Sequence, residues 1–154
     1  MRKKAVKHTT LPDPKFGDAQ VTKFVNNLMY DGKKSKSFDI FYGAIDIVAE
    51  KSGEDGLEVF RKALTNVTPQ VEVRTRRVGG ANFQIPQQVR EERKKSLAMK
   101  WLIGYARSRN ERSMAQKLAN EILAASKEEG AAFKKKEEVH KMAEANKAFS
   151  HFRF

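Results

Sequence analysis

Arginine side chains gather in a short stretch, VEVRTRRVGGANFQIPQQV at residues 71–89, in which Glu72 is the single acid. The planar guanidinium group of arginine can hold a phosphate through two hydrogen bonds or stack on a base. Arg74, Arg76 and Arg77 therefore indicate the chemistry of polyanion binding. A solvated ribbon edge needs only one or two lysines to prevent aggregation, so this much charge favours nucleic-acid binding over the plainer explanation.

The positive charge of the chain is concentrated in two segments. The sequence has 31 Lys and Arg against 19 Asp and Glu, a formal net charge of +12. Residues 1–17 hold five basic residues and one acid, and residues 71–112 hold eleven basic residues and four acids. Localised charge of this kind indicates a polyanionic partner, with nucleic acid favoured over an anionic membrane surface. No run of about 18 apolar residues exists, so no membrane-spanning helix is expected, and a membrane is not among the expected partners.

Other residues with chemical potential do not form a convergent set. His140 has Glu137 and Glu144 one helical turn away on either side, but such a face is more typical of a solvated helix than of a metal site. Residues 32–35 read GKKS, yet the earlier glycine of a phosphate-binding loop is replaced by Asn27. No serine, histidine and aspartate grouping stands out, and the chain lacks cysteine. We therefore expect no metal, no cofactor, no small-molecule substrate and no enzymatic activity.

Apolar residues at three- and four-residue spacing predict six helices that would position the basic residues. Asp18 can cap the first helix, and Ser113 with Gln116 has the pattern of a capping box before the fifth. The break between the first two helices would contain three lysines. The six helices are expected after Asp18, from about Phe38 to Ser52, from Gly56 to Val67, after Glu91, from Ser113 to about Lys127, and from about Ala132 to Phe149.

Between the third and fourth helices the apolar period changes from helical to alternating, which predicts a β-hairpin. Residues 79–82, GGAN, supply the turn, and Pro86 is compatible only with an edge strand. The predicted fold is mainly α: a single six-helix domain over residues 18–154, with an inserted, protruding hairpin at about 71–90. Residues 1–17 are expected to form a flexible basic arm, although a plain disordered terminus is the alternative.

Two questions stay open at the level of residue chemistry. Phe83 beside the turn could stack on a base, or it could simply staple the ribbon. The basic arms could also serve a DNA-bending protein, since β-arms carrying proline enter minor grooves. Recognition of RNA by shape and backbone needs no base code, so composition does not decide between the two nucleic acids.

Four strings of residues occur in order along the chain: LPDPKFGDAQVTKFVNNLMYDGKKS at 11–35, VEVRTRRVGGANFQIPQQV at 71–89, SLAMKWLIGYARSR at 96–109 and HKMAEANKAFSHFRF at 140–154. With these strings the chain resembles, over essentially its whole length, the family of the seventh small-subunit ribosomal protein of bacteria and organelles. The strings GGANFQIP and MAEANKAF are the most specific. Small departures occur at Asn82-Phe83, Gln87-Gln88 and Phe154, where the family more usually has a hydroxyl residue and Tyr, Val-Glu, and Trp.

The resemblance implies a structural, rRNA-binding protein of the small ribosomal subunit, located in the bacterial cytoplasm or in an organelle. It implies a primary binder of the 3′ major domain of 16S rRNA that nucleates assembly of the subunit head. It also implies a place at the subunit interface, near the exit-site tRNA and the mRNA path, with small-subunit proteins nine and eleven as neighbours.

The resemblance also implies which residues make these contacts. Those expected to contact rRNA are basic side chains in the arm, the first interhelical loop, the ribbon and the fourth helix: Arg2, Lys3, Lys4, Lys7, Lys15, Lys33, Lys34, Lys36, Arg74, Arg76, Arg77, Lys94, Lys95, Arg107 and Arg109. For Arg107 and Arg109 the favourable interaction of cations with a helix C-terminus is an alternative explanation. Those expected to face the exit-site tRNA and mRNA form the ribbon tip: Gly79, Gly80, Ala81, Asn82 and Phe83.

Overall fold

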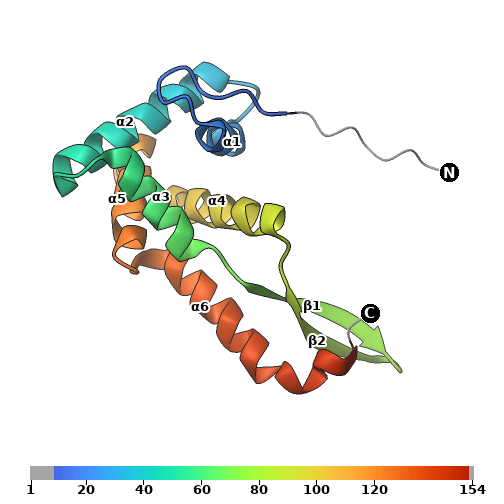
Figure 1. The fold of residues 1–154 in the computed structure, drawn as a ribbon. Helices are drawn as coiled ribbons and strands as arrows, with labels where there is room; N and C mark the ends of the chain where they lie inside the picture. The colour runs from blue at the N-terminus through green and yellow to red at the C-terminus, as the bar shows by residue number, and fades with distance from the viewer. Residues whose placement is uncertain (1–8, 153–154) are drawn as a thin grey trace.

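The computed structural model describes residues 9–152, with the backbone alone at Val78 and Phe152, and shows six α-helices and one β-hairpin in this part of the chain (Figure 1). This architecture confirms the predicted fold class. In chain order the elements are α1 (Ala19–Leu28), α2 (Lys34–Ser52), α3 (Gly56–Val67), β1 (Val71–Val78), β2 (Ala81–Gln88), α4 (Glu91–Arg107), α5 (Met114–Ser126), α6 (Gly130–Ala145) and a closing 3-10 helix η1 (Lys147–Phe152).

Side-chain caps fix the starts of three helices. The carboxylates of Asp18 and Asp55 accept from the N–H groups of Gln20 and Leu57, and the Ser113 hydroxyl accepts from Gln116. Each cap satisfies one of the N–H groups that a helix start leaves without a partner. The predicted caps at the beginnings of α1 and α5 are therefore confirmed.

The core lies among the first five helices, with α5 packed against α2, α3 and α4. At its centre the rings of Phe24, Phe41 and Phe60 contact one another, with centroid distances of 5.0 to 5.5 Å. Aromatic pairs at such distances add about 0.5–1.5 kcal/mol each beyond the burial of their area. This cluster makes the helical body a fixed base for the extended part of the molecule.

The hairpin closes through Gly79 and Gly80 alone, whose φ angles are 56° and 88°. Two central residues with positive φ fit the tight turn that matches the twist of the strands. Ala81 therefore begins the second strand and pairs with Val78, and Asn82 pairs with Arg77. The sequence had suggested a turn that included Ala81 and Asn82. The prediction of an antiparallel hairpin is confirmed, and that of its turn is wrong by two residues.

The ribbon does not stand alone, because α6 and η1 pack against it (Figure 1). The Phe83 and Phe149 rings have centroids 5.3 Å apart, and the backbone N–H of Gln70, just before β1, donates to His140 Nε2 on α6. The expected single last helix reaching Phe149 is wrong, since α6 ends at Ala145 and the chain continues as η1. This change of direction brings Phe149 onto the ribbon.

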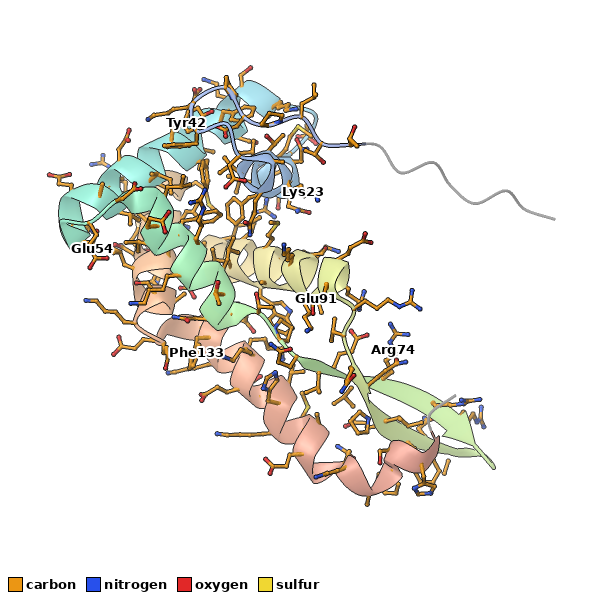
Figure 2. All side chains as sticks on the ribbon, viewed as in Figure 1. Lys23, Tyr42, Glu54, Arg74, Glu91 and Phe133 are labelled. Atoms are coloured by element: carbon orange, nitrogen blue, oxygen red, sulfur yellow. The ribbon has the colours of Figure 1, made fainter. Side chains whose placement is uncertain are left out.

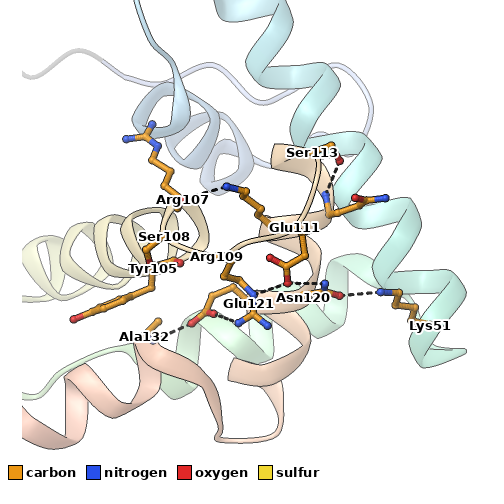
Figure 3. A network of polar contacts seen from close by, with 12 residues as sticks. Lys51, Tyr105, Arg107, Ser108, Arg109, Glu111, Ser113, Asn120, Glu121 and Ala132 are labelled. Carbon is orange, nitrogen blue, oxygen red and sulfur yellow. Dashed lines mark hydrogen bonds and ion pairs between the residues drawn. The ribbon is translucent and has the colours of Figure 1, made fainter.

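A buried carboxylate attaches α6 to the helical body. Glu121 of α5 is 0% exposed; its Oε1 accepts from the Ala132 N–H at 2.9 Å and its Oε2 from Arg109 Nη1 at 2.6 Å (Figure 3). Gly130 lies against this carboxylate with φ +89°, and a Cβ there would come within 3.1 Å of Glu121 Oε1. The start of α6, and with it the support of the ribbon, is thereby fixed.

The segment before α1 is folded onto α2 from Asp13 onward. The Asp13 carboxylate accepts from the N–H groups of Lys15, Phe16 and Asp18, and from the Tyr42 hydroxyl at 3.0 Å. Burial alone would raise the pKa of Asp13, but these hydrogen bonds lower it overall. These contacts hold residues 13–18 against the helical domain.

Candidate nucleic-acid interface

The three arginines of the ribbon are exposed and divide between its two faces. The antiparallel register places Arg74 opposite Ile85, Arg76 opposite Phe83 and Arg77 opposite Asn82. Because side chains alternate along a strand, Arg74 and Arg76 share one face and Arg77 lies on the other. Both faces of the ribbon therefore carry exposed cationic side chains.

A groove of about 510 Å³ lies between the ribbon base and the start of α4. Glu72 is only 13% exposed there, and its carboxylate pairs with Arg74 Nη2 and with Arg93 Nε, each at 2.8 Å. Arg90 and Arg93 line the groove beside Arg74, although sequence reasoning did not select them as site residues. Their position within the basic segment 71–112 is the sequence feature that could have identified them as site residues.

The first turn of α4 adds two further cations. Lys94 pairs with Glu91 and its side chain is mostly covered, while Lys95 is exposed. The hydrogen bond and the charge of Lys94, together with the charge of Lys95, lower the pKa of Glu91. We call Arg74, Arg76, Arg77, Arg90, Arg93, Lys94 and Lys95 the ribbon cluster.

A second group of cations lies at the start of α2. Lys33 precedes the helix, but Lys34 and Lys36 lie in its first turn, so the expectation that all three occupy a loop is wrong. The first turn of α2 has no acidic residue and no side-chain cap. Cations at a helix N-terminus face its positive dipole end, an arrangement that a bound anion would relieve. We call Lys33, Lys34, Lys36 and Arg107 the loop cluster.

Arg107 and Arg109 are close in sequence but differ in their surroundings (Figure 3). Arg107 at the end of α4 donates from Nη2 to the Leu28 carbonyl at 3.1 Å, and its guanidinium lies 4.0 Å from the centroid of the Tyr30 ring. The guanidinium of Arg109 forms ion pairs inside the protein, with Glu111 at 3.0 Å and with Glu121 at 2.6 Å. The structure therefore groups Arg107 with the lysines of α2, and sets Arg109 apart.

The two clusters occupy opposite ends of α4. Lys94 and Arg107 are separated by thirteen helical residues, which corresponds to about 20 Å at 1.5 Å per residue. Figure 2 shows Arg74 and Glu91 on one side of the molecule and Glu54 on the far side. A partner that contacts both clusters must be extended over this distance, as a folded polynucleotide is.

Several expected contact residues lie elsewhere. Lys15 is placed on the surface of α2, where its ammonium lies 5.1 Å from the Tyr42 ring centroid and 3.4 Å from Asp46 Oδ1. Arg2, Lys3, Lys4 and Lys7 lie outside the described residues. The ribbon tip from Gly79 to Asn82 is exposed, whereas Phe83 is half-buried against Phe149, which supports the intramolecular alternative for that ring.

Residues 9–152 contain no cluster of three metal-ligating side chains. His140, the candidate raised by the sequence, instead accepts a hydrogen bond from the Gln70 N–H at 3.1 Å. Burial, followed by the nearby charge of Lys136, lowers the pKa of His140, so the neutral imidazole is favoured as acceptor. Among the helices described, none is both long and apolar enough to cross a membrane.

A helical body with a braced cationic ribbon and a second basic cluster defines a protein of the nucleic-acid-binding class. The family model described as Ribosomal protein S7p/S5e matches residues 1–147. The chain belongs to this ribosomal protein family, and the resemblance noted in the sequence is confirmed.

Curated relatives resemble the chain over its full length. Small ribosomal subunit protein uS7 of Cytophaga hutchinsonii is 66% identical over 155 residues, which cover 100% of both chains. The protein of the same name from Flavobacterium johnsoniae is 66% identical over 158 residues, again covering 100% of both. That of Marinobacter nauticus is 60% identical over 153 residues, covering 99% of this chain and 98% of the relative.

Proposed function

We propose that this protein binds the 3′ major domain of 16S rRNA through the ribbon and loop clusters and thereby nucleates assembly of the small-subunit head. The coarser part of this function follows from the family: the protein is a structural, rRNA-binding constituent of the small ribosomal subunit and not an enzyme. The bacterial relatives indicate a bacterial ribosome in the cytoplasm.

The observation that carries the proposal is the placement of two basic clusters at the two ends of one rigid helix. Arginine and lysine side chains bind phosphates without reading bases, and RNA helices are recognised largely by shape and backbone. The uncapped, lysine-rich start of α2 is electrostatically unfavourable in the isolated protein. A phosphate near Lys33 and Lys36 would remove this disadvantage.

The family resemblance supports the finer placement. Under this proposal the ribbon tip, Gly79 to Phe83, faces the exit-site tRNA and the mRNA path, and proteins nine and eleven are the neighbours. The exposure of residues 79–82 at the far end of the ribbon is compatible with that placement.

The proposal is tested by the salt dependence of binding to a folded fragment of the 3′ major domain. Each phosphate contact releases counterions, so replacing Arg74, Arg76 and Arg77 together by Gln should reduce the slope of log K against log salt by about two to three. Filter binding or fluorescence anisotropy at four or more salt concentrations gives the slope. Gln removes the charge while keeping a polar side chain that can still form hydrogen bonds.

A charge-matched control separates local contacts from total charge. Lys51, Lys62 and Lys127 line a hollow beside Glu54, on the far side of the molecule (Figure 2). Replacing these three by Gln lowers the net charge equally and should leave most of the slope unchanged. Equal slopes for the two triple variants, or tighter binding of the unaltered protein to duplex DNA at the same salt, would contradict the proposal.

A further inference from the structure

Tyr30 is a large aromatic side chain left on the surface. It is 63% exposed, and the other exposed large apolar side chains in the described part are aliphatic: Leu11 at 78% and Met142 at 39%. Aromatic side chains of this size are normally largely covered in a folded domain. The exposure of Tyr30 makes its side chain available to a partner outside the chain.

The backbone around Tyr30 is fixed by a tight turn. The Lys33 N–H donates to the Tyr30 carbonyl at 2.9 Å, and the two central residues, Asp31 and Gly32, have φ angles of 52° and 71°. Aspartate and glycine are among the residues that tolerate positive φ, and the hydrogen bond closes the turn. Tyr30 and Lys33 are thus the first and fourth residues of one turn, with Cα atoms within about 7 Å.

One face of the Tyr30 ring is already occupied by a cation. The Arg107 guanidinium carbon lies 4.0 Å from the ring centroid, and Arg107 is itself held by its hydrogen bond to the Leu28 carbonyl. Tyr30 as a whole residue stays 63% exposed although Arg107 covers one face of its ring, which leaves the other face available to a partner. The pair is a preformed platform whose ring is oriented before any partner arrives.

The chain segment that carries Tyr30 is cationic. Residues 29–36 contain Lys33, Lys34 and Lys36 against one acid, Asp31, and the lysines lie at the positive end of α2. The centre of a protein-binding surface is typically depleted in lysine. An exposed aromatic ring within a lysine-rich segment instead fits a ligand that combines a flat π-system with negative charge, which describes a nucleotide.

We propose that Tyr30 stacks on an unpaired base of the bound RNA while Lys33, Lys34 and Lys36 contact the adjacent phosphates. This inference rests on the proposed rRNA-binding function and specifies what one part of the interface recognises. A base inside a duplex has both faces covered by its neighbours, so the ligand is a nucleotide in a loop, a bulge or a strand end. Arg107, stacked behind the ring, positions it and adds a cation–π contribution.

The test compares Tyr30→Leu with Tyr30→Phe in the full chain, using the same folded rRNA fragment. Tyr30→Leu removes the aromatic face but keeps apolar bulk, and because stacking on one aromatic residue is sequence-tolerant and strong, it should weaken binding about tenfold. Tyr30→Phe should bind within about twofold of the unaltered protein, since the ring remains. Neither change removes a charge, so the salt slope should be unchanged in both. Thermal melts of both variants check that the exposed position leaves folding intact.

Ultraviolet cross-linking supplies a second readout on the complex. The inference predicts a cross-link between an RNA base and the peptide that contains Tyr30. Equal binding by Tyr30→Leu and the unaltered protein, with no such cross-link, would overturn it while leaving the rRNA-binding function in place. Normal RNA binding by Tyr30→Leu combined with poor incorporation into small subunits would also overturn it and indicate a protein partner. Failure of the unaltered protein to bind the fragment would instead count against the proposed function itself.

Discussion

Glu121 shows how a single residue controls the extended part of the molecule. Its carboxylate is completely buried yet has two partners, the guanidinium of Arg109 and the N–H of Ala132 in the first turn of α6. A negative charge at a helix start is favourable, and Arg109 neutralises the charge that burial would otherwise penalise. Because α6 supports the ribbon, this contact links the helical body to the ribbon cluster.

We expect Glu121→Gln to lower the free energy of unfolding by about 3 kcal/mol, because removing one member of a buried pair leaves the other without its partner. Chemical denaturation monitored by circular dichroism measures the change. The matched control is Glu129→Gln, the same substitution at an exposed residue that makes no side-chain cap, which should change stability by less than about 0.5 kcal/mol. Equal effects of the two substitutions would show that the buried contact does not stabilise the fold.

The sequence contained part of this information. Glu121 interrupts the apolar stripe of α5 between Leu118 and Ile122, and a carboxylate in a core-facing position requires a partner. The sequence could not predict that Arg109 is this partner, because Arg109 lies twelve residues before Glu121, beyond the end of α4. The pattern at 107–112 suggested only surface arginines, and the pairing depends on how α4 and α5 cross.

At the scale of elements, the ribbon, α6 and η1 form one extended unit. The ribbon is joined to α6 at its base by His140 and Gln70, and to η1 near its tip by Phe83 and Phe149. A two-stranded hairpin alone is marginally stable in water. These two contacts explain how an exposed cationic ribbon keeps a defined shape.

The contact of His140 predicts a pH dependence at the ribbon base. Burial and Lys136 lower the pKa of His140 in the folded protein below its ordinary value of 6.5, so the unfolded state binds the proton more readily. The contribution of neutral His140 to the stability of the fold is therefore complete above pH 6.5. It is lost as the pH falls toward and through the lowered pKa of the folded state. Hydrogen exchange of the Gln70 amide, corrected for its intrinsic rate, should show less protection at pH 5.5 than at pH 7.5.

A His140→Gln variant serves as the comparison for that experiment. The glutamine amide can still accept a hydrogen bond but does not titrate, so the difference in Gln70 protection between the two pH values should disappear. Unaltered pH dependence in His140→Gln would assign the effect to another group, and identical protection at both pH values in the original protein would contradict the prediction.

Element boundaries were predicted well where a side chain marks them. The starts of α1 and α5, and the end of α2 at Gly53, which adopts a left-handed conformation, follow from residue types. The start of α2 was placed too late because no side chain caps it and lysines are not typical of a helix start. The end of α6 was missed because residues 145–149 keep helix-favouring composition, and tertiary contact with the ribbon redirects the chain.

For the molecule as a whole, charge in the sequence predicted where cations gather but not how each is used. The basic segment 71–112 folds into the ribbon cluster and the helix that separates it from the loop cluster. Within that segment Arg74 and Arg93 both form ion pairs with Glu72, whereas Arg109 forms an ion pair with the buried Glu121. Such assignments depend on long-range contacts, which is why a count of charges showed where the cations lie along the chain but not which of them pair within it.

Binding of rRNA by the ribbon and loop clusters is tested most directly by comparing lysine reactivity in assembled small subunits with that in the free protein. A soluble amine-specific reagent followed by mass spectrometry reports each lysine separately. The account predicts that Lys33, Lys36 and Lys95 are exposed and reactive in the free protein and strongly protected in the subunit, while Lys62 on the far side changes far less. Equal reactivity of Lys33, Lys36 and Lys95 in the free protein and in the subunit would contradict the claim that these two basic clusters hold the rRNA.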